Sequence, residues 1–162
     1  MKLFIKNKIM SLNESSFAEN EQGEQVFTIK GKVFTITHKK EIYDKFGNLL
    51  FIVKNKIWNF WNKRAYILNS SKEKVAVVKF QPLNFKTPYI LEGYKEEIAL
   101  TGNFAKRDLQ VTSPNGVLGT ITRDLTLIRD AFTLEAEEKD LAFLTAVVIA
   151  IDNIVDAERK KR

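Results

Sequence analysis

The sequence predicts a mainly β protein, a closed twelve-stranded antiparallel β-barrel around a central C-terminal α-helix. Three observations predict it: a motif that recurs at fixed spacing, alternation of apolar and cationic residues within that motif, and one late segment that is apolar on every side. The 162 residues suffice for a single domain with its own core, and 44% hydrophobic with 28% charged residues is typical of globular chains. We expect barrel strands over about residues 1–136, a helix over about 140–157 and a basic tail over 158–162.

The recurring motif is an aliphatic residue followed by a Lys-x-Lys pair. Three strong copies begin 24 residues apart and three weaker copies follow: Ile5–Lys8, Ile29–Lys32, Val53–Lys56, Val78–Gln81, Leu100–Asn103 and Ile121–Asp124. Self-similarity at a fixed period indicates one supersecondary unit used repeatedly. Six units therefore fill the chain up to about residue 139.

Each unit is expected to contribute two strands. The first strand runs through the motif, and the second runs through a short segment such as Glu41–Tyr43, Ala65–Leu68, Tyr89–Leu91, Leu109–Thr112 or Phe132–Leu134. Turn residues separate the units at Asn20–Gly23, Asp44–Asn48, Asn69–Glu73, Glu92–Glu96 and Ser113–Gly116. Because side chains alternate along a strand, the aliphatic residues share one face and the lysines take the other. This one-sided pattern indicates an antiparallel sheet with a solvated, basic outer face.

The late apolar segment, Leu141–Ile151, contains no charge, Gly or Pro. Eleven residues are too few to cross a bilayer, which takes roughly 20, so we expect a core helix over Asp140–Ala157. Twelve strands leave a lumen wide enough for such a helix. A two-sheet sandwich with the helix on one side is the alternative architecture. Asp152, on the polar stripe of this helix with Thr145 and Asp156, needs a partner if it is buried, and we expect either a structural hydrogen bond or a pair with a lysine.

The motif at its 24-residue period resembles the LURP-one-related family, in its short bacterial form. Ile42-Tyr43-Asp44-x-x-Gly47-Asn48 and the final Val147–Asp152 are also similar to that family. The resemblance covers essentially the whole chain and implies a tubby-like fold, a twelve-stranded barrel around a central C-terminal helix. The same superfamily includes the phospholipid scramblases and the tubby domains, which bind phosphoinositides through basic residues of the barrel wall. The resemblance therefore implies that basic residues of the wall bind lipid head groups, and the lysines of the motif are of that type.

Residues suited to catalysis or metal binding are scarce. The chain has no Cys and one His, His38, which is expected in a solvated hairpin loop. The carboxylates of Glu135, Glu137, Glu138 and Asp140 are best explained as acids at a helix start, where they complement the dipole. Glycines occur singly and form no phosphate-binding loop. We therefore expect a non-enzymatic protein without a cofactor or a metal.

A net charge of +6 and a pI near 9.4 favour anionic partners. The candidate site for anionic lipid head groups comprises Lys30, Lys32, Lys54, Lys56, Trp58, Trp61, Lys63 and Arg64, because cations bind phosphate while Trp suits a head-group boundary. The same residues could instead bind nucleic acid. Trp58, Phe60 and Trp61 could also cap the barrel or form a protein–protein interface, as in a structural or interaction domain. Without a visible signal peptide or any Cys, we expect a cytoplasmic protein that can associate peripherally with a membrane.

Overall fold

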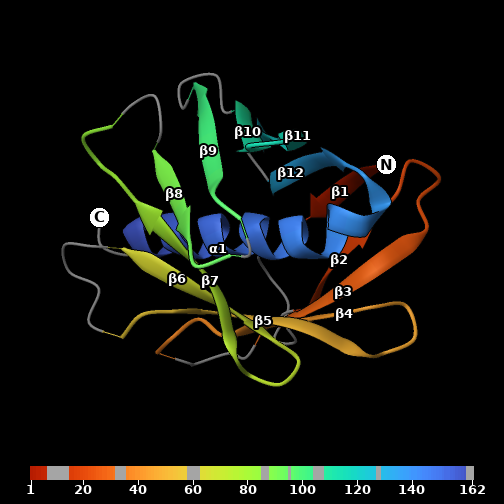
Figure 1. Ribbon diagram of the computed structural model, residues 1–162. Helices are drawn as coiled ribbons and strands as arrows, with labels where there is room; N and C mark the ends of the chain where they lie inside the picture. The colour runs from red at the N-terminus through yellow and green to blue at the C-terminus, as the bar shows by residue number, and fades with distance from the viewer. Residues whose placement is uncertain are drawn as a thin grey trace.

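Twelve strands form one closed antiparallel barrel around a long helix in the computed structural model (Figure 1). It describes residues 1–6, 15–31, 36–57, 63–84, 88–94, 96–103, 108–126 and 129–159. Each strand pairs with the strands before and after it in the sequence, and β1 pairs with β12 to close the ring. The predicted helix-filled barrel is confirmed, and the alternative of a two-sheet sandwich is wrong.

The elements follow one another with short connections. The strands are β1 (Lys2–Lys6), β2 (Ser15–Glu19), β3 (Gln25–Gly31), β4 (Lys40–Tyr43), β5 (Leu49–Asn55), β6 (Arg64–Asn69), β7 (Lys74–Phe80), β8 (Tyr89–Glu92), β9 (Ile98–Asn103), β10 (Asp108–Ser113), β11 (Gly116–Thr126) and β12 (Arg129–Ala136). A 3-10 turn, η1 (Glu138–Asp140), leads into the helix α1 (Leu141–Arg159).

The predicted alternation of faces is confirmed at the aliphatic position of the repeated motif. All six residues at this position face the lumen and are at most 1% exposed: Ile5, Ile29, Val53, Val78, Leu100 and Ile121. The period of two along a strand turns the next residue, usually a lysine, toward solvent. Burial of this apolar ring against α1 is the main favourable contribution to folding.

The central helix lies inside the barrel with its side chains buried on all sides, as predicted. Its Phe143 ring stacks on Tyr94, with ring centroids 3.9 Å apart, and meets Phe51 edge-on at 6.0 Å. Gly119 on β11 makes room for the helix, because a Cβ there would lie 2.8 Å from Leu144 Cδ1. At these positions the wall and the helix are in close contact.

The start of the helix differs slightly from the predicted boundary. Asp140 belongs to η1, because its N–H donates to the carbonyl of Glu137, three residues back, at 3.0 Å. The α-helix begins one residue later, at Leu141, where the chain becomes buried. Glu137 forms an ion pair with Lys139 at 2.7 Å, so the acidic segment lies on the outside, before the helix enters the lumen.

The barrel has two rims with different connections. Because neighbouring strands are antiparallel, odd-numbered strands end at the rim where α1 ends, which we call the carboxyl rim. Even-numbered strands end at the opposite, amino rim, where α1 begins. The described carboxyl rim consists of residues 36–39, 55–57, 63–64, 80–84 and 88. The described amino rim consists of residues 20–24, 44–48, 69–73, 92–94, 96–97, 113–116 and 136–140.

Three turns of the amino rim share one geometry. In each, the N–H of the fourth residue donates to the carbonyl of the first, which is Asn20, Asp44 or Asn69, at 2.9 to 3.1 Å. The side chain of that first residue accepts further backbone N–H groups, as Asn and Asp do in turns. The fourth residue takes a left-handed φ in all three turns: 78° at Gly23, 85° at Gly47 and 66° at Lys72.

Candidate functional site

Three cations lie directly opposite one another across three neighbouring strands of the outer wall. The N–H of Lys56 donates to the carbonyl of Arg64 at 3.0 Å, and Arg64 is the register partner of Lys79 on β7. All three face outward because the adjacent residues on their strands face the lumen: Asn55, Ala65 and Val78. We call Lys56, Arg64 and Lys79 the cation row.

Further positive charge flanks the cation row. Lys54 lies two residues before Lys56 on the same face of β5, and Lys63 immediately precedes Arg64. Lys79 forms an ion pair with Glu92, whereas no carboxylate of the described chain pairs with Lys54 or Lys56. Like charges placed directly opposite on a sheet repel each other, so a bound anion would stabilise this arrangement.

Lys30 has a different environment. Its register partner is Glu41 on β4, which forms an ion pair with Lys39 at 2.6 Å. Tyr43 donates its hydroxyl to Glu41 at 2.7 Å, and this hydrogen bond to a carboxylate raises the pKa of Tyr43. The Lys30 ammonium lies 4.8 Å from the centroid of the Tyr43 ring. Since β4 separates Lys30 from Lys54, the structure does not bring them into one patch.

The predicted site is thus divided by the structure. Four of the predicted residues lie at the end of β5 and the start of β6: Lys54, Lys56, Lys63 and Arg64. Lys30 lies apart from them on β3, two strands away from β5. The remaining candidates, Lys32, Trp58 and Trp61, lie outside the described residues. Sequence reasoning left Lys79 out of the site, although it occupies the same repeat position as Lys30 and Lys54. This shared repeat position could have identified Lys79 as a candidate from the sequence. The strand register then shows that Lys79 lies opposite Arg64.

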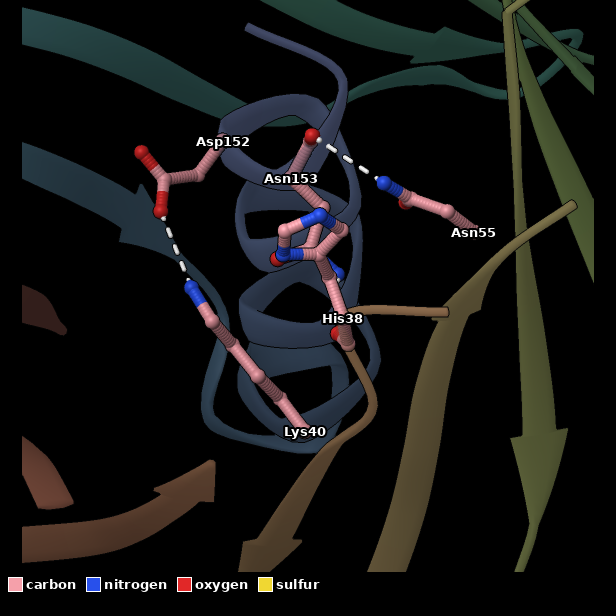
Figure 2. Close-up of polar contacts among 5 residues, drawn as sticks. All are labelled: His38, Lys40, Asn55, Asp152 and Asn153. Carbon is pink, nitrogen blue, oxygen red and sulfur yellow. Dashed lines mark hydrogen bonds and ion pairs between the residues drawn. The ribbon is translucent and has the colours of Figure 1, made fainter. Parts of the chain in front are cut away.

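A polar cluster fastens the end of α1 to the wall (Figure 2). Asp152 is fully buried, and its carboxylate pairs with the Lys40 ammonium at 3.1 Å. Lys40 starts β4 and faces inward, unlike the lysines of the repeated motif. The expectation that Asp152 would have a structural partner is confirmed, and that partner is a lysine.

Two asparagines complete this cluster. Asn55, the middle residue of a Lys-x-Lys motif, faces the lumen and donates to the backbone carbonyl of Asn153 at 3.2 Å. The Asn153 amide in turn donates to the carbonyl of His38 at 3.0 Å, and the Asn55 N–H donates to the carbonyl of Thr37 at 2.7 Å. His38 lies in the β3–β4 loop as expected, but it is half-buried beside the helix rather than fully solvated. These contacts hold a loop, a strand and the helix together at the carboxyl rim.

A hollow of about 690 Å³ lies along β8 and β9. Its lining includes three carboxylates and two tyrosines but neither lysine nor arginine: Gln81, Asn84, Tyr89, Ile90, Leu91, Glu92, Gly93, Tyr94, Glu96, Glu97, Ile98, Ala99 and Leu100. Burial, together with the negative charges of Asp140 and Glu96, raises the pKa of Tyr94. An acidic lining repels anions, so this hollow does not extend the cationic site.

The described residues contain no group of three or more His, Cys, Asp or Glu side chains placed to hold a metal ion. Among the same residues, no helix is both long enough and apolar enough to cross a membrane.

Comparisons with known proteins agree with the observed fold. A family model described as LURP-one-related matches residues 1–152. A crystal structure of a protein from Arabidopsis thaliana superposes with a TM-score of 0.63 at 14% sequence identity, covering 94% of this chain and 91% of that one. At that identity the likeness shows the fold alone. A search of curated proteins found no match. Because the family model spans the entire barrel and the greater part of α1, this chain belongs to the LURP-one-related family.

Proposed function

We propose that this domain is a non-enzymatic binding or tethering module for the head groups of anionic phospholipids at a membrane surface. The observation that carries the proposal is the cation row, Lys56, Arg64 and Lys79, in which like charges oppose one another across three strands. Lys54 and Lys63 add to its charge. Phosphate oxygens between these side chains would relieve their repulsion.

The number of cations suits a weak, reversible association. Each Lys or Arg near an anionic membrane surface contributes on the order of 1 kcal/mol, and the effect falls off within a Debye length. The cation row with Lys54 and Lys63 would contribute less than the sum of five free charges, because Lys79 pairs with Glu92 and both Lys63 and Arg64 have interactions within the chain. Binding should therefore weaken steeply as salt is added.

The fold supplies the second support. The tubby-like resemblance implies lipid recognition by basic residues of the barrel wall, and the cation row lies on that wall. Lys30 belongs to the proposed surface only as a second, separate contact, and Lys32, two residues further along the sequence, lies outside the described residues. Trp58 and Trp61, which the sequence places between Lys56 and Lys63, would add aromatic contacts at the head-group boundary.

Vesicle flotation tests the proposal. The double variant Lys54→Glu with Lys56→Glu should lose most of its binding to vesicles of three parts phosphatidylcholine and one part phosphatidylserine. A matched control reverses two exposed cations of the amino rim, Lys45→Glu with Lys72→Glu, and changes the net charge by the same amount. The control variant should keep most of its binding. If the unaltered protein does not float with these vesicles, or if both variants bind equally, the proposed site is wrong.

Competition distinguishes the remaining partners. The same cations could hold the phosphates of a polynucleotide, whose binding also falls steeply with salt. Double-stranded DNA added to the flotation assay should displace little protein if lipid is the preferred ligand. Complete displacement at equal phosphate concentration would favour a nucleic-acid-binding module. Indifference to both lipid and DNA would favour a structural or protein-interaction domain.

A further inference from the structure

We propose that the domain docks end-on, with its carboxyl rim facing an anionic bilayer and exposed loop residues entering the head-group region. This inference rests on the proposed function, but it adds the part of the surface that makes contact and the orientation of the barrel. The docking surface consists of Ile36, Ile57 and Leu83 together with the neighbouring cation row.

Large apolar side chains stand exposed on three separate connections of the carboxyl rim. Ile36, between β3 and β4, is 83% exposed, and Ile57, after β5, is 51% exposed. Leu83, between β7 and β8, is 91% exposed. All three connections leave the same end of the barrel, so these side chains project from one rim.

Cations accompany these apolar residues. Lys56 directly precedes Ile57 and is itself exposed, and it begins the cation row that continues through Arg64 to Lys79 at the end of β7. Apolar side chains flanked by Lys and Arg are typical of segments that lie at a membrane interface. Because the apolar residues come from separate loops, they suit a fluid surface, which does not require the shape complementarity of a protein partner.

The amino rim has the opposite charge, although it also exposes large apolar side chains, at Met1, Phe46 and Val117. Of the segments that join strands at the carboxyl rim, the structure describes residues 36–39, 56–57, 63, 81–84 and 88, which contain three large apolar residues, three lysines and no carboxylate. The described segments at the amino rim, residues 20–24, 44–48, 70–73, 93–94, 96–97, 114–115 and 137–140, contain two large aromatic residues, three lysines and nine carboxylates. An anionic surface would therefore attract one end of the barrel and repel the other.

This charge difference sets the orientation. The helix α1 runs along the barrel from the acidic amino rim to the carboxyl rim (Figure 1). With the carboxyl rim against the head groups, α1 stands along the bilayer normal and the acidic turns point away from the surface. Docking by the side wall would instead leave Ile36 and Leu83 in water.

Single-cysteine labelling separates end-on from side-on docking, because the chain contains no native Cys. Leu83→Cys places an environment-sensitive fluorophore on the carboxyl rim. Phe46→Cys is the matched control on the amino rim, since Phe46 is also an apolar loop residue, 78% exposed. Each labelled full-length protein is mixed with vesicles of three parts phosphatidylcholine and one part phosphatidylserine, with and without a lipid-embedded quencher.

End-on docking predicts a blue shift and quenching at position 83 but neither at position 46. Independently, Leu83→Glu should weaken vesicle binding roughly tenfold, while Phe46→Glu should leave it unchanged or slightly weaker through charge alone. If the protein floats with the vesicles but both labels stay in water, end-on docking is wrong and the lipid-binding proposal stands. If the protein does not bind these vesicles at all, both proposals are wrong.

Discussion

Removing one side of the buried ion pair between Lys40 and Asp152 should destabilise the barrel strongly. Lys40→Met keeps most of the aliphatic stem and removes the ammonium, whose distance to the Asp152 carboxylate is 3.1 Å. The Asp152 side chain is 0% exposed, so its charge would remain in the lumen without this partner. Water cannot reach the carboxylate unless the end of α1 moves away from the wall.

The expected magnitude follows from that burial. Removing one partner of a buried ion pair costs about 3–5 kcal/mol, a large part of the 5–15 kcal/mol that stabilises an ordinary domain. Asp152→Asn should cost less, about 1–3 kcal/mol, because the Lys40 side chain is 17% exposed and can turn its ammonium toward solvent. Replacing both residues, as Lys40→Met with Asp152→Leu, should recover much of the loss, since neither charge of the buried pair remains.

Urea denaturation followed by circular dichroism measures these free energies of unfolding. Lys39→Met is the control, because Lys39 is the neighbouring lysine and pairs with Glu41 on the wall, where the two side chains are 29% and 20% exposed. That change should cost at most about 1 kcal/mol. If Lys40→Met costs no more than Lys39→Met, or if the double replacement is as unstable as Lys40→Met alone, the reasoning about the buried carboxylate is wrong.

Three further changes test the helix and the amino-rim turns. Ile149→Lys puts a charge in the middle of α1, where Ile149 is 1% exposed. The cost of several kcal/mol in stability should abolish cooperative thermal melting. A melting curve like that of the unaltered protein would contradict the central-helix interpretation. Lys72→Gly should raise the free energy of unfolding, measured in urea, by roughly 0.5–1 kcal/mol. Lys72 has a left-handed φ of 66°, and the related turns have Gly23 and Gly47 at the same position. A loss of stability in this variant would refute the argument from backbone strain. Hydrogen bonds from Asn48 and from backbone N–H groups hold the pKa of Asp44 below its usual range, so Asp44 stabilises the fold above that range and less as pH falls through the lowered pKa. Asp44→Asn should therefore destabilise the protein near neutral pH, with a difference that shrinks in acid; a pH-independent difference would count against the hydrogen-bonded carboxylate.

The architecture could be predicted from the sequence because it depends on periodicities that local patterns report. Alternation along each repeat identified the lumen-facing residues, such as Ile29 and Val53, and the uninterrupted apolar run identified the helix that they enclose. A closed barrel with the helix inside buries both apolar surfaces and also leaves no unpaired sheet edge, which a two-sheet sandwich does not achieve. The exact start of α1 was harder to predict, because an acidic residue such as Asp140 is equally compatible with a 3-10 turn and with the first turn of an α-helix.

The candidate site was less predictable because it depends on which residues meet across strands. Lys30 and Lys54 occupy the same repeat position, yet β4 places Glu41 opposite Lys30 and β6 places Tyr66 opposite Lys54. Spacing along the chain carries no information about these partners. The inward direction of Lys40 follows from alternation, because Lys40 shares the face of buried Ile42 on β4, but its pairing with Asp152 joins two residues far apart in the chain, which no local pattern reports.

The closure of the ring has a consequence for how the chain folds during its synthesis. The amino group of Met1 donates to the carbonyl of Ala136, a partner 135 positions further along the chain, and β1 pairs with β12 beside it. The segment that fills the interior follows this last strand. While the ribosome is still producing the wall, the first strands have an unpaired edge and an empty apolar side, both of which promote aggregation. The nascent barrel therefore depends on slow, long-range pairing at the end of translation, and molecular chaperones would have the most to protect just before α1 emerges.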